Sequence, residues 1–116
     1  MTTLLLDRDL IAEIKRVGQA TGRHDLHAVF VRKLEGSLKD FPAAFSRHLA
    51  HGDTAAALRA AHTLKGSCRQ IGAHALGDLF ADIERSAKSG DYDAAKRMFE
   101  SARDLVEQSL EALKQA

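Results

Sequence analysis

Residues 53–72 read DTAAALRAAHTLKGSCRQIG, and their apolar residues have the spacing of an amphipathic helix. At about 100° of rotation per residue, one side of this helix carries Ala57, Ala60, Leu64, Cys68 and Ile71, with Ser67 at its edge. The other side carries His62, with Ala55, Leu58 and Arg59 before it and Lys65, Gly66 and Arg69 after it. Because the apolar stripe of such a helix faces the core, the spacing predicts that His62 is displayed to solvent or to a partner.

The residues that follow His62 indicate what the imidazole could do. Lys65 lies one turn away on the same face, where its ammonium group can reach a group attached to the ring. Gly66 lies directly below the ring, although glycine inside a helix costs about 1 kcal/mol relative to alanine, and close approach of another surface would explain it. Arg69 adds a second cation. This pattern suits a nucleophilic imidazole that receives an anionic group, most simply phosphoryl, from another macromolecule.

These residues also carry a resemblance. Ala61-His62-Thr63-Leu64-Lys65-Gly66-Ser67, followed by Ile71-Gly72-Ala73, Leu76 and Ile83-Glu84, resembles the histidine-containing phosphotransfer (HPt) domain of two-component phosphorelays. The resemblance extends from about Leu26 to the last residue and leaves only the N-terminal segment outside. Cys68 departs from the family pattern, in which serine or alanine is more usual, and we expect this difference to alter packing only.

The resemblance implies a function and its partners. His62 would accept a phosphoryl group from an aspartate of one receiver domain and pass it to another, so the partners would be response-regulator receiver domains and a hybrid histidine kinase. Lys65 would contact the phosphoryl group and Gly66 would admit the partner. The protein would be a monomeric carrier and not an enzyme. It would need no cofactor, since Mg²⁺ would be held by the receiver.

Composition narrows the class of protein. With 116 residues, the chain is expected to form one domain, residues 1–116, and is too short to include a kinase with its own ATP-binding module. The net charge of +1 includes no long basic run, which argues against nucleic-acid binding. A single cysteine suits a reducing compartment, and Leu4-Leu5-Leu6 is too short for a signal peptide or a membrane span. We therefore expect a cytoplasmic protein that does not enter a membrane.

Capping residues and glycines divide the chain into five expected helices, which makes the fold all-α. They run from Asp7 to about Thr21, from Asp25 to about His51, from Asp53 to about Gly72, from Ala73 to Ser89 and from Tyr92 to about Lys114. Pro42 should break or kink the second, which leaves open one bent helix or two. Short turns predict an antiparallel up-down-up-down four-helix bundle over residues 24–115, with the helix in residues 1–22 packing on it.

Other side chains have less specific interpretations. Arg59, Arg69 and Gln70 could contact the partner or the phosphoryl group, or could simply be solvated. Leu58 and Ala55 are candidates for docking, whereas Leu76 and Leu79 are more typical of core, and Glu84 fits a cap or an interhelical salt link better than chemistry. The pairs His24/His27 and His48/His51 have helical spacing, but no carboxylate or thiolate completes a zinc site, so no metal is expected.

Two other functions fit parts of this pattern. One is the dimeric phosphoacceptor helix pair of a sensor kinase, but those sites typically follow the histidine with an acidic residue, and here Thr63 follows. The other is a helical bundle that binds proteins without being phosphorylated. The presence of both His62 and Lys65 argues against that alternative.

Overall fold

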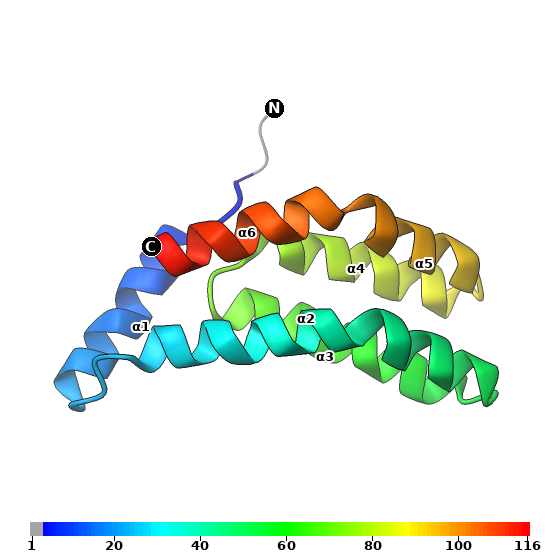
Figure 1. Cartoon of the computed structure of the whole chain (residues 1–116), viewed down its shortest axis with the longest axis horizontal. Coiled ribbons are helices and arrows are strands. Elements are labelled where there is room, and N and C mark those ends of the chain that lie inside the picture. The colour runs from blue at the N-terminus through cyan, green and yellow to red at the C-terminus, as the bar shows by residue number, and fades with distance from the viewer. Residues whose placement is uncertain (1–3) are drawn as a thin grey trace.

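The computed structural model describes residues 4–116, and all the regular structure in this range is helical, which confirms the all-α prediction (Figure 1). The helices are α1 (Arg8–Ala20), α2 (Leu26–Ala50), α3 (Thr54–Gln70), α4 (His74–Lys88), α5 (Tyr92–Ser101) and α6 (Arg103–Gln115). Each of α2, α3 and α4 packs against the next, α5 packs on α4, and α6 closes the arrangement against both α2 and α4. In Figure 1, α3 turns back along α2, and α5 and α6 turn back along α4.

The helices α1, α3 and α5 begin at aspartates that cap them. The side chains of Asp7, Asp53 and Asp91 accept hydrogen bonds from backbone N–H groups three residues later, at 3.1, 3.0 and 3.0 Å. Such bonds satisfy donors that have no partner inside the helix. The cap at Asp53 fixes where α3 starts.

The N-terminal segment and α1 lie against the turn between α3 and α4. The backbone N–H of Asp7 donates to the carbonyl of Gly72 at 2.8 Å, and that of Ala75 donates to the carbonyl of Leu5 at 3.2 Å. Gly72 has φ +89°, and a Cβ there would lie 2.6 Å from a side-chain carbon of Ile11, which is buried. Only glycine fits this close approach, so α1 rests directly on the turn.

Pro42 does not break α2. Of the two alternatives that the sequence left open, one helix or two, the structure has a single helix of 25 residues. The proline ring lies at the surface, while Phe41 and Phe45, which flank it on the helix, are buried, with ring centroids 5.2 Å apart. Proline inside a helix costs about 3 kcal/mol. Burial of two phenylalanines recovers about 1.5–3 kcal/mol each, which is enough to keep the helix continuous.

The expected single helix from Tyr92 to Lys114 is wrong, because the structure interrupts it at Ala102. This residue has φ −97° and ψ 17°, and its N–H bonds to the carbonyl of Phe99, three residues back, at 3.1 Å. Alanine favours helix, so the cause is not local. The interruption lets α5 follow α4 while α6 crosses to contact α2 as well.

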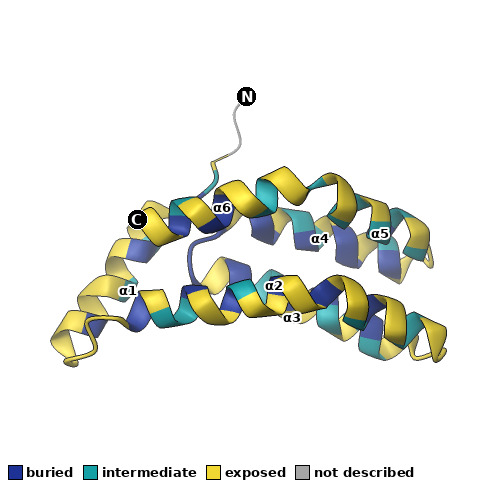
Figure 2. Cartoon of the chain, in the orientation of Figure 1, coloured by how far each residue is buried: buried dark blue, intermediate teal, exposed yellow. Residues whose placement is uncertain are grey.

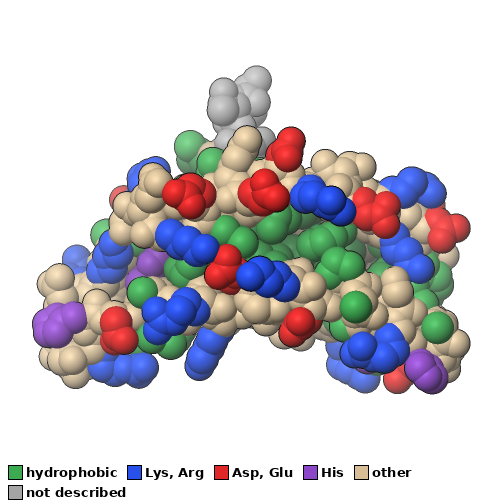
Figure 3. Space-filling view, in the orientation of Figure 1, with side chains coloured by type: hydrophobic (Ala, Val, Ile, Leu, Met, Phe, Trp, Pro, Cys, Tyr) green, Lys and Arg blue, Asp and Glu red, His purple; other side chains and the backbone are tan. Residues whose placement is uncertain are grey.

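The core lies between the helices, and Figure 2 shows the buried positions turned inward. Its centre is an aromatic cluster in which the ring centroid of Phe41 lies 5.1 Å from that of Phe80 and 5.2 Å from that of Phe99. A groove of about 470 Å³ between α2 and α5–α6 opens over this cluster, and hydrophobic side chains fill this part of the surface in Figure 3. The structure thus has an apolar face on the side of α2 and α6.

Most of the predicted apolar stripe of α3 is buried. Ala57, Leu64, Cys68 and Ile71 are in the core and Ala60 is half-buried, but Ala61 is also fully buried. The buried stripe is wider than predicted because α3 packs against both α2 and α4. Burial raises the pKa of the Cys68 thiol to about 12. Cys68 therefore acts as a small apolar residue.

A buried histidine makes the stability of the fold depend on pH. Burial lowers the pKa of His27 from its ordinary value of 6.5, and nearby Lys15 lowers it further, although a bond between His27 Nε2 and the carbonyl of Ile71 at 3.3 Å acts in the opposite direction. The unfolded state therefore binds the proton more readily. We expect the contribution of neutral His27 to the free energy of unfolding to be fully present above pH 6.5. This contribution should be lost as the pH falls from 6.5 toward the lowered pKa of His27.

The measurement is urea unfolding between about pH 7.5 and about pH 5.5. His27→Gln, which can still donate to Ile71, should lose less stability over this range than the wild type. The exposed His24 provides the control, because His24→Gln should follow the wild-type curve. Parallel curves for His27→Gln and the wild type would contradict the assignment.

Within residues 4–116, no helix is both long and apolar enough to cross a membrane.

Candidate functional site

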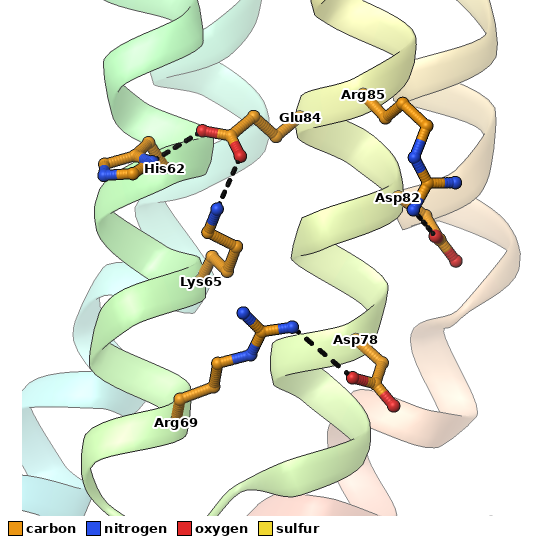
Figure 4. Close-up of polar contacts among 7 residues, drawn as sticks. All are labelled: His62, Lys65, Arg69, Asp78, Asp82, Glu84 and Arg85. Atoms are coloured by element: carbon orange, nitrogen blue, oxygen red, sulfur yellow. Dashed lines mark hydrogen bonds and ion pairs between the residues drawn. The ribbon is translucent and has the colours of Figure 1, made fainter.

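His62 lies in the middle of α3 and projects away from the core, with 67% of its side chain exposed (Figure 4). Its neighbours Ala61 and Leu64 are both buried, so the packing of α3 determines which way the ring points. One side of the ring is therefore accessible to another molecule, and the other side faces α4.

Glu84 of α4 holds one nitrogen of this ring. The distance from His62 Nδ1 to Glu84 Oε2 is 2.6 Å. An ionised carboxylate only accepts hydrogen bonds, so Nδ1 must carry the hydrogen and donate it. The tautomer is set by this bond, which leaves the lone pair of a neutral ring on Nε2.

Lys65 bonds to the other oxygen of the same carboxylate. Its Nζ lies 2.7 Å from Glu84 Oε1, and only 22% of the Lys65 side chain and 7% of the Glu84 side chain are exposed. The Lys65 hydrogen bond lowers the pKa of the Glu84 carboxyl, burial opposes this shift, and the His62 bond lowers the pKa further. Glu84 is therefore an anion that links the imidazole to the lysine across α3 and α4.

The sequence interpretation of Glu84 was incomplete. The expected salt link is present, with Lys65, but the second oxygen of the carboxylate also orients His62. The spacing held a signal: Glu84 follows Phe80 by four residues and Ile83 by one, on the buried face of α4. A carboxylate on a buried face requires a polar partner, and His62 and Lys65 on α3 are the two side chains that the sequence offers.

Gly66 leaves open space beside the site. A Cβ built on this residue would meet nothing within 4 Å. The fold itself therefore does not require glycine at this position. The backbone below His62 is accessible to whatever approaches the ring.

Arg69 is the second cation on this side of α3. Its side chain is half-exposed, and its Nη2 lies 3.6 Å from Asp78 Oδ1 on α4. The structure thus brings His62, Lys65 and Arg69 together along the boundary between α3 and α4 (Figure 4).

The remaining candidates lie in different environments. Arg59 is exposed and lines a groove between α2 and α3, and Ala55 is exposed one turn earlier. Leu58 is half-buried and packs against the core. Leu76 is fully buried and Leu79 half-buried, in agreement with the core interpretation.

The histidine pairs have separate surroundings. His24 is exposed, whereas His27 is buried and bonds to the carbonyl of Ile71; His51 Nδ1 donates to the carbonyl of Arg47 at 2.8 Å. In the described part of the chain, no three histidine, cysteine or carboxylate side chains cluster as metal ligands.

Comparison with protein families matches the chain to a family model. The model of the Hpt domain matches residues 25–116, from the start of α2 onward, and includes His62, Lys65 and Glu84. Comparison with the curated proteins and with the solved structures gave no match. The match spans well over half of the chain and contains the whole site. The chain therefore belongs to the Hpt domain family.

Proposed function

We propose that this protein is the phosphocarrier of a two-component phosphorelay, which accepts a phosphoryl group on His62 from a receiver-domain aspartate and passes it to another response regulator. The observation that supports this best is the exposed imidazole whose Nδ1 is bonded to Glu84, so that Nε2 faces outward beside the open backbone of Gly66. Hpt domains act in phosphorelays as carriers and bind receiver domains.

In the proposed reaction, the Nε2 lone pair attacks the phosphorus of the aspartyl phosphate. A P–N bond forms, the P–O bond to aspartate breaks, and the carboxylate leaves with the electron pair. Because Nδ1 keeps its hydrogen, the phosphorylated ring is cationic, and the adjacent Glu84 carboxylate stabilises that charge. The ammonium of Lys65 has three donors and uses one on Glu84, so others are free for the phosphoryl oxygens. Transfer to the second receiver reverses these steps.

The scaffold in this proposal is a monomeric, antiparallel up-down-up-down four-helix bundle in which α5 and α6 together form the last helix. Its partners are response-regulator receiver domains and a hybrid histidine kinase. Phosphoryl transfer depends mainly on positioning and on stabilising charge. The carrier therefore has to supply an oriented imidazole, while the receiver provides the aspartate and Mg²⁺.

The direct test is to incubate the protein with a receiver domain that carries a radiolabelled aspartyl phosphate. We expect label on the protein, stable in alkali and labile in acid as for a P–N bond, and located by mass spectrometry on the peptide that contains His62. ATP alone should give no label. Label on another residue, or none with any receiver of the host, would refute the proposal, and label from ATP alone would favour a sensor-kinase domain.

Gly66→Ala should separate transfer from stability. Since a Cβ meets nothing in the folded protein, the substitution should stabilise the fold by about 0.5–1 kcal/mol. The new methyl group would meet the docked receiver, and we expect kcat/KM for transfer to fall about 10-fold, or about 1.4 kcal/mol. Thermal unfolding and initial transfer rates measure the two effects.

Gly36→Ala is the matched control for this substitution. Gly36 also lies inside a helix, α2, and a Cβ there also meets nothing within 4 Å. It should give the same gain in stability with unchanged transfer. Equal transfer rates for Gly66→Ala and Gly36→Ala would show that the receiver does not approach Gly66.

A further inference from the structure

Gly77 of α4 is buried beneath the side chain of Arg69. A Cβ on Gly77 would lie 2.7 Å from Arg69 Cγ and 3.3 Å from its Nε. Contacts below 3.0 Å are not compatible with a real side chain, so the arginine could not keep this position above any residue larger than glycine. The absence of a side chain at position 77 therefore creates the surface on which the stem of Arg69 lies.

The guanidinium group of Arg69 faces a carboxylate but makes no hydrogen bond to it. Its nearest carboxylate oxygen, on Asp78, is 3.6 Å away, which is too long for a hydrogen bond, and His74 Nε2 lies 3.6 Å from the other oxygen of Asp78. By contrast, Arg85 and Asp82 on the same helix form a closed pair at 2.9 Å. In Figure 4 one nitrogen of Arg69 faces Asp78 and another points toward the Lys65 end of the site. The N–H groups of Arg69 therefore point toward Asp78 and the site but form no short ion pair with Asp78.

Arg69 lies where a docked molecule would cover it. It follows His62 by seven residues, or about two helical turns and 10 Å along the same face, and its side chain is 50% exposed. Any protein that places an aspartyl phosphate against His62 Nε2 brings an anionic site to this face. A guanidinium fixed in direction can bind a carboxylate with two parallel bonds and little further loss of side-chain freedom.

We propose that Gly77 positions Arg69 to bind an acidic group on the surface of the receiver domain docked at His62. This inference rests on the proposed phosphocarrier function. Asp78 keeps the guanidinium in place before docking, and the receiver carboxylate replaces it at hydrogen-bonding distance. Arg69 is thus a docking residue, and Gly77 acts through it.

The test is a double-mutant cycle of Arg69→Ala and Gly77→Ala, measured as kcat and KM for transfer from the phosphorylated receiver that labels the wild type fastest. Each single variant should raise KM about 10-fold, the loss expected for a charge-assisted contact at a partly exposed surface, with kcat unchanged. The double variant should be no worse than Arg69→Ala alone, because Gly77 acts only through the arginine. It should also melt at a higher temperature than Gly77→Ala, since the clash is gone.

Several results would overturn this inference. Multiplicative KM effects would show that Gly77 acts independently of Arg69. A fall in kcat for Arg69→Ala would place the guanidinium on the phosphoryl group and not on the receiver surface, and an unchanged KM would mean that no contact forms. If Gly77→Ala does not fold, Arg69→Lys remains decisive. Lysine keeps the charge but cannot form the two parallel bonds of a guanidinium, so KM must rise for this variant. Because all rates are compared with a wild type labelled on His62, failure here is distinct from failure of the carrier function.

Discussion

Replacement of His62 by glutamine is expected to abolish phosphoryl transfer, with label on the protein falling below about one-thousandth of the wild-type level. Glutamine has no nucleophilic nitrogen, because its amide lone pair is delocalised. It does keep a donor that can reach Glu84, now 2.6 Å from the ring nitrogen. The site is exposed, so the free energy of unfolding should stay within about 0.5 kcal/mol of the wild-type value.

This variant is measured by the rate of label transfer from a phosphorylated receiver and by urea unfolding. His48→Gln serves as the control, since His48 is a half-buried histidine of α2 on the groove between α2 and α3. It should transfer normally. Residual label on His62→Gln with wild-type kinetics would mean that the phosphoryl group is carried by another residue.

Replacement of Glu84 by glutamine is expected to have the second-largest effect, because one carboxylate orients the imidazole and pairs with Lys65. A glutamine amide can present its NH₂ group to either partner, so the tautomer of the ring is no longer enforced and the cationic phosphorylated ring loses its counter-charge. We expect kcat to fall about 10- to 100-fold, as when the group behind a metal-bound imidazole is removed. The free energy of unfolding should fall by about 1–3 kcal/mol.

Glu35→Gln is the control for Glu84→Gln. Glu35 forms an ion pair of similar length with Lys114, 2.8 Å, but within residues 4–116 it makes no hydrogen bond to a histidine, and both side chains are more exposed than Glu84. Its loss should leave transfer unchanged. The pH dependence adds a second measure: the lowered pKa of Glu84 gives stability that is present above its ordinary value of 4.5 and lost as the pH falls toward the lowered value, and Glu84→Gln should lack this component.

The helices could be located from the sequence where local signals decide them. Asp7 and Asp53 stand at two of the expected helix starts, and the side chains of both accept a capping hydrogen bond. The continuity of α2 at Pro42 and the interruption at Ala102 could not be predicted in this way, because each depends on contacts with other helices. At both positions tertiary packing overrides the local preference.

In the candidate site, too, some residues could be located from the sequence and others could not. His62, Lys65 and Gly66 lie within five consecutive residues of one helix, so helical geometry alone relates them. Glu84 is 22 residues from His62, and its distance to the ring depends on how α4 is aligned beside α3. The position of Arg69 likewise depends on a missing side chain on the neighbouring helix. Spacing along one helix cannot reveal either contact.

The burial of Cys68 has a practical consequence for following docking in solution. The thiolate is the form of cysteine that attacks thiol reagents, and a fully buried thiol with a pKa of about 12 supplies almost none. In the variant Ala55→Cys, a maleimide fluorophore would therefore modify the new, exposed cysteine while leaving Cys68 untouched. Such a dye, two helical turns from the phosphoacceptor on the same face of α3, would report receiver binding by its change in emission without any need to remove Cys68.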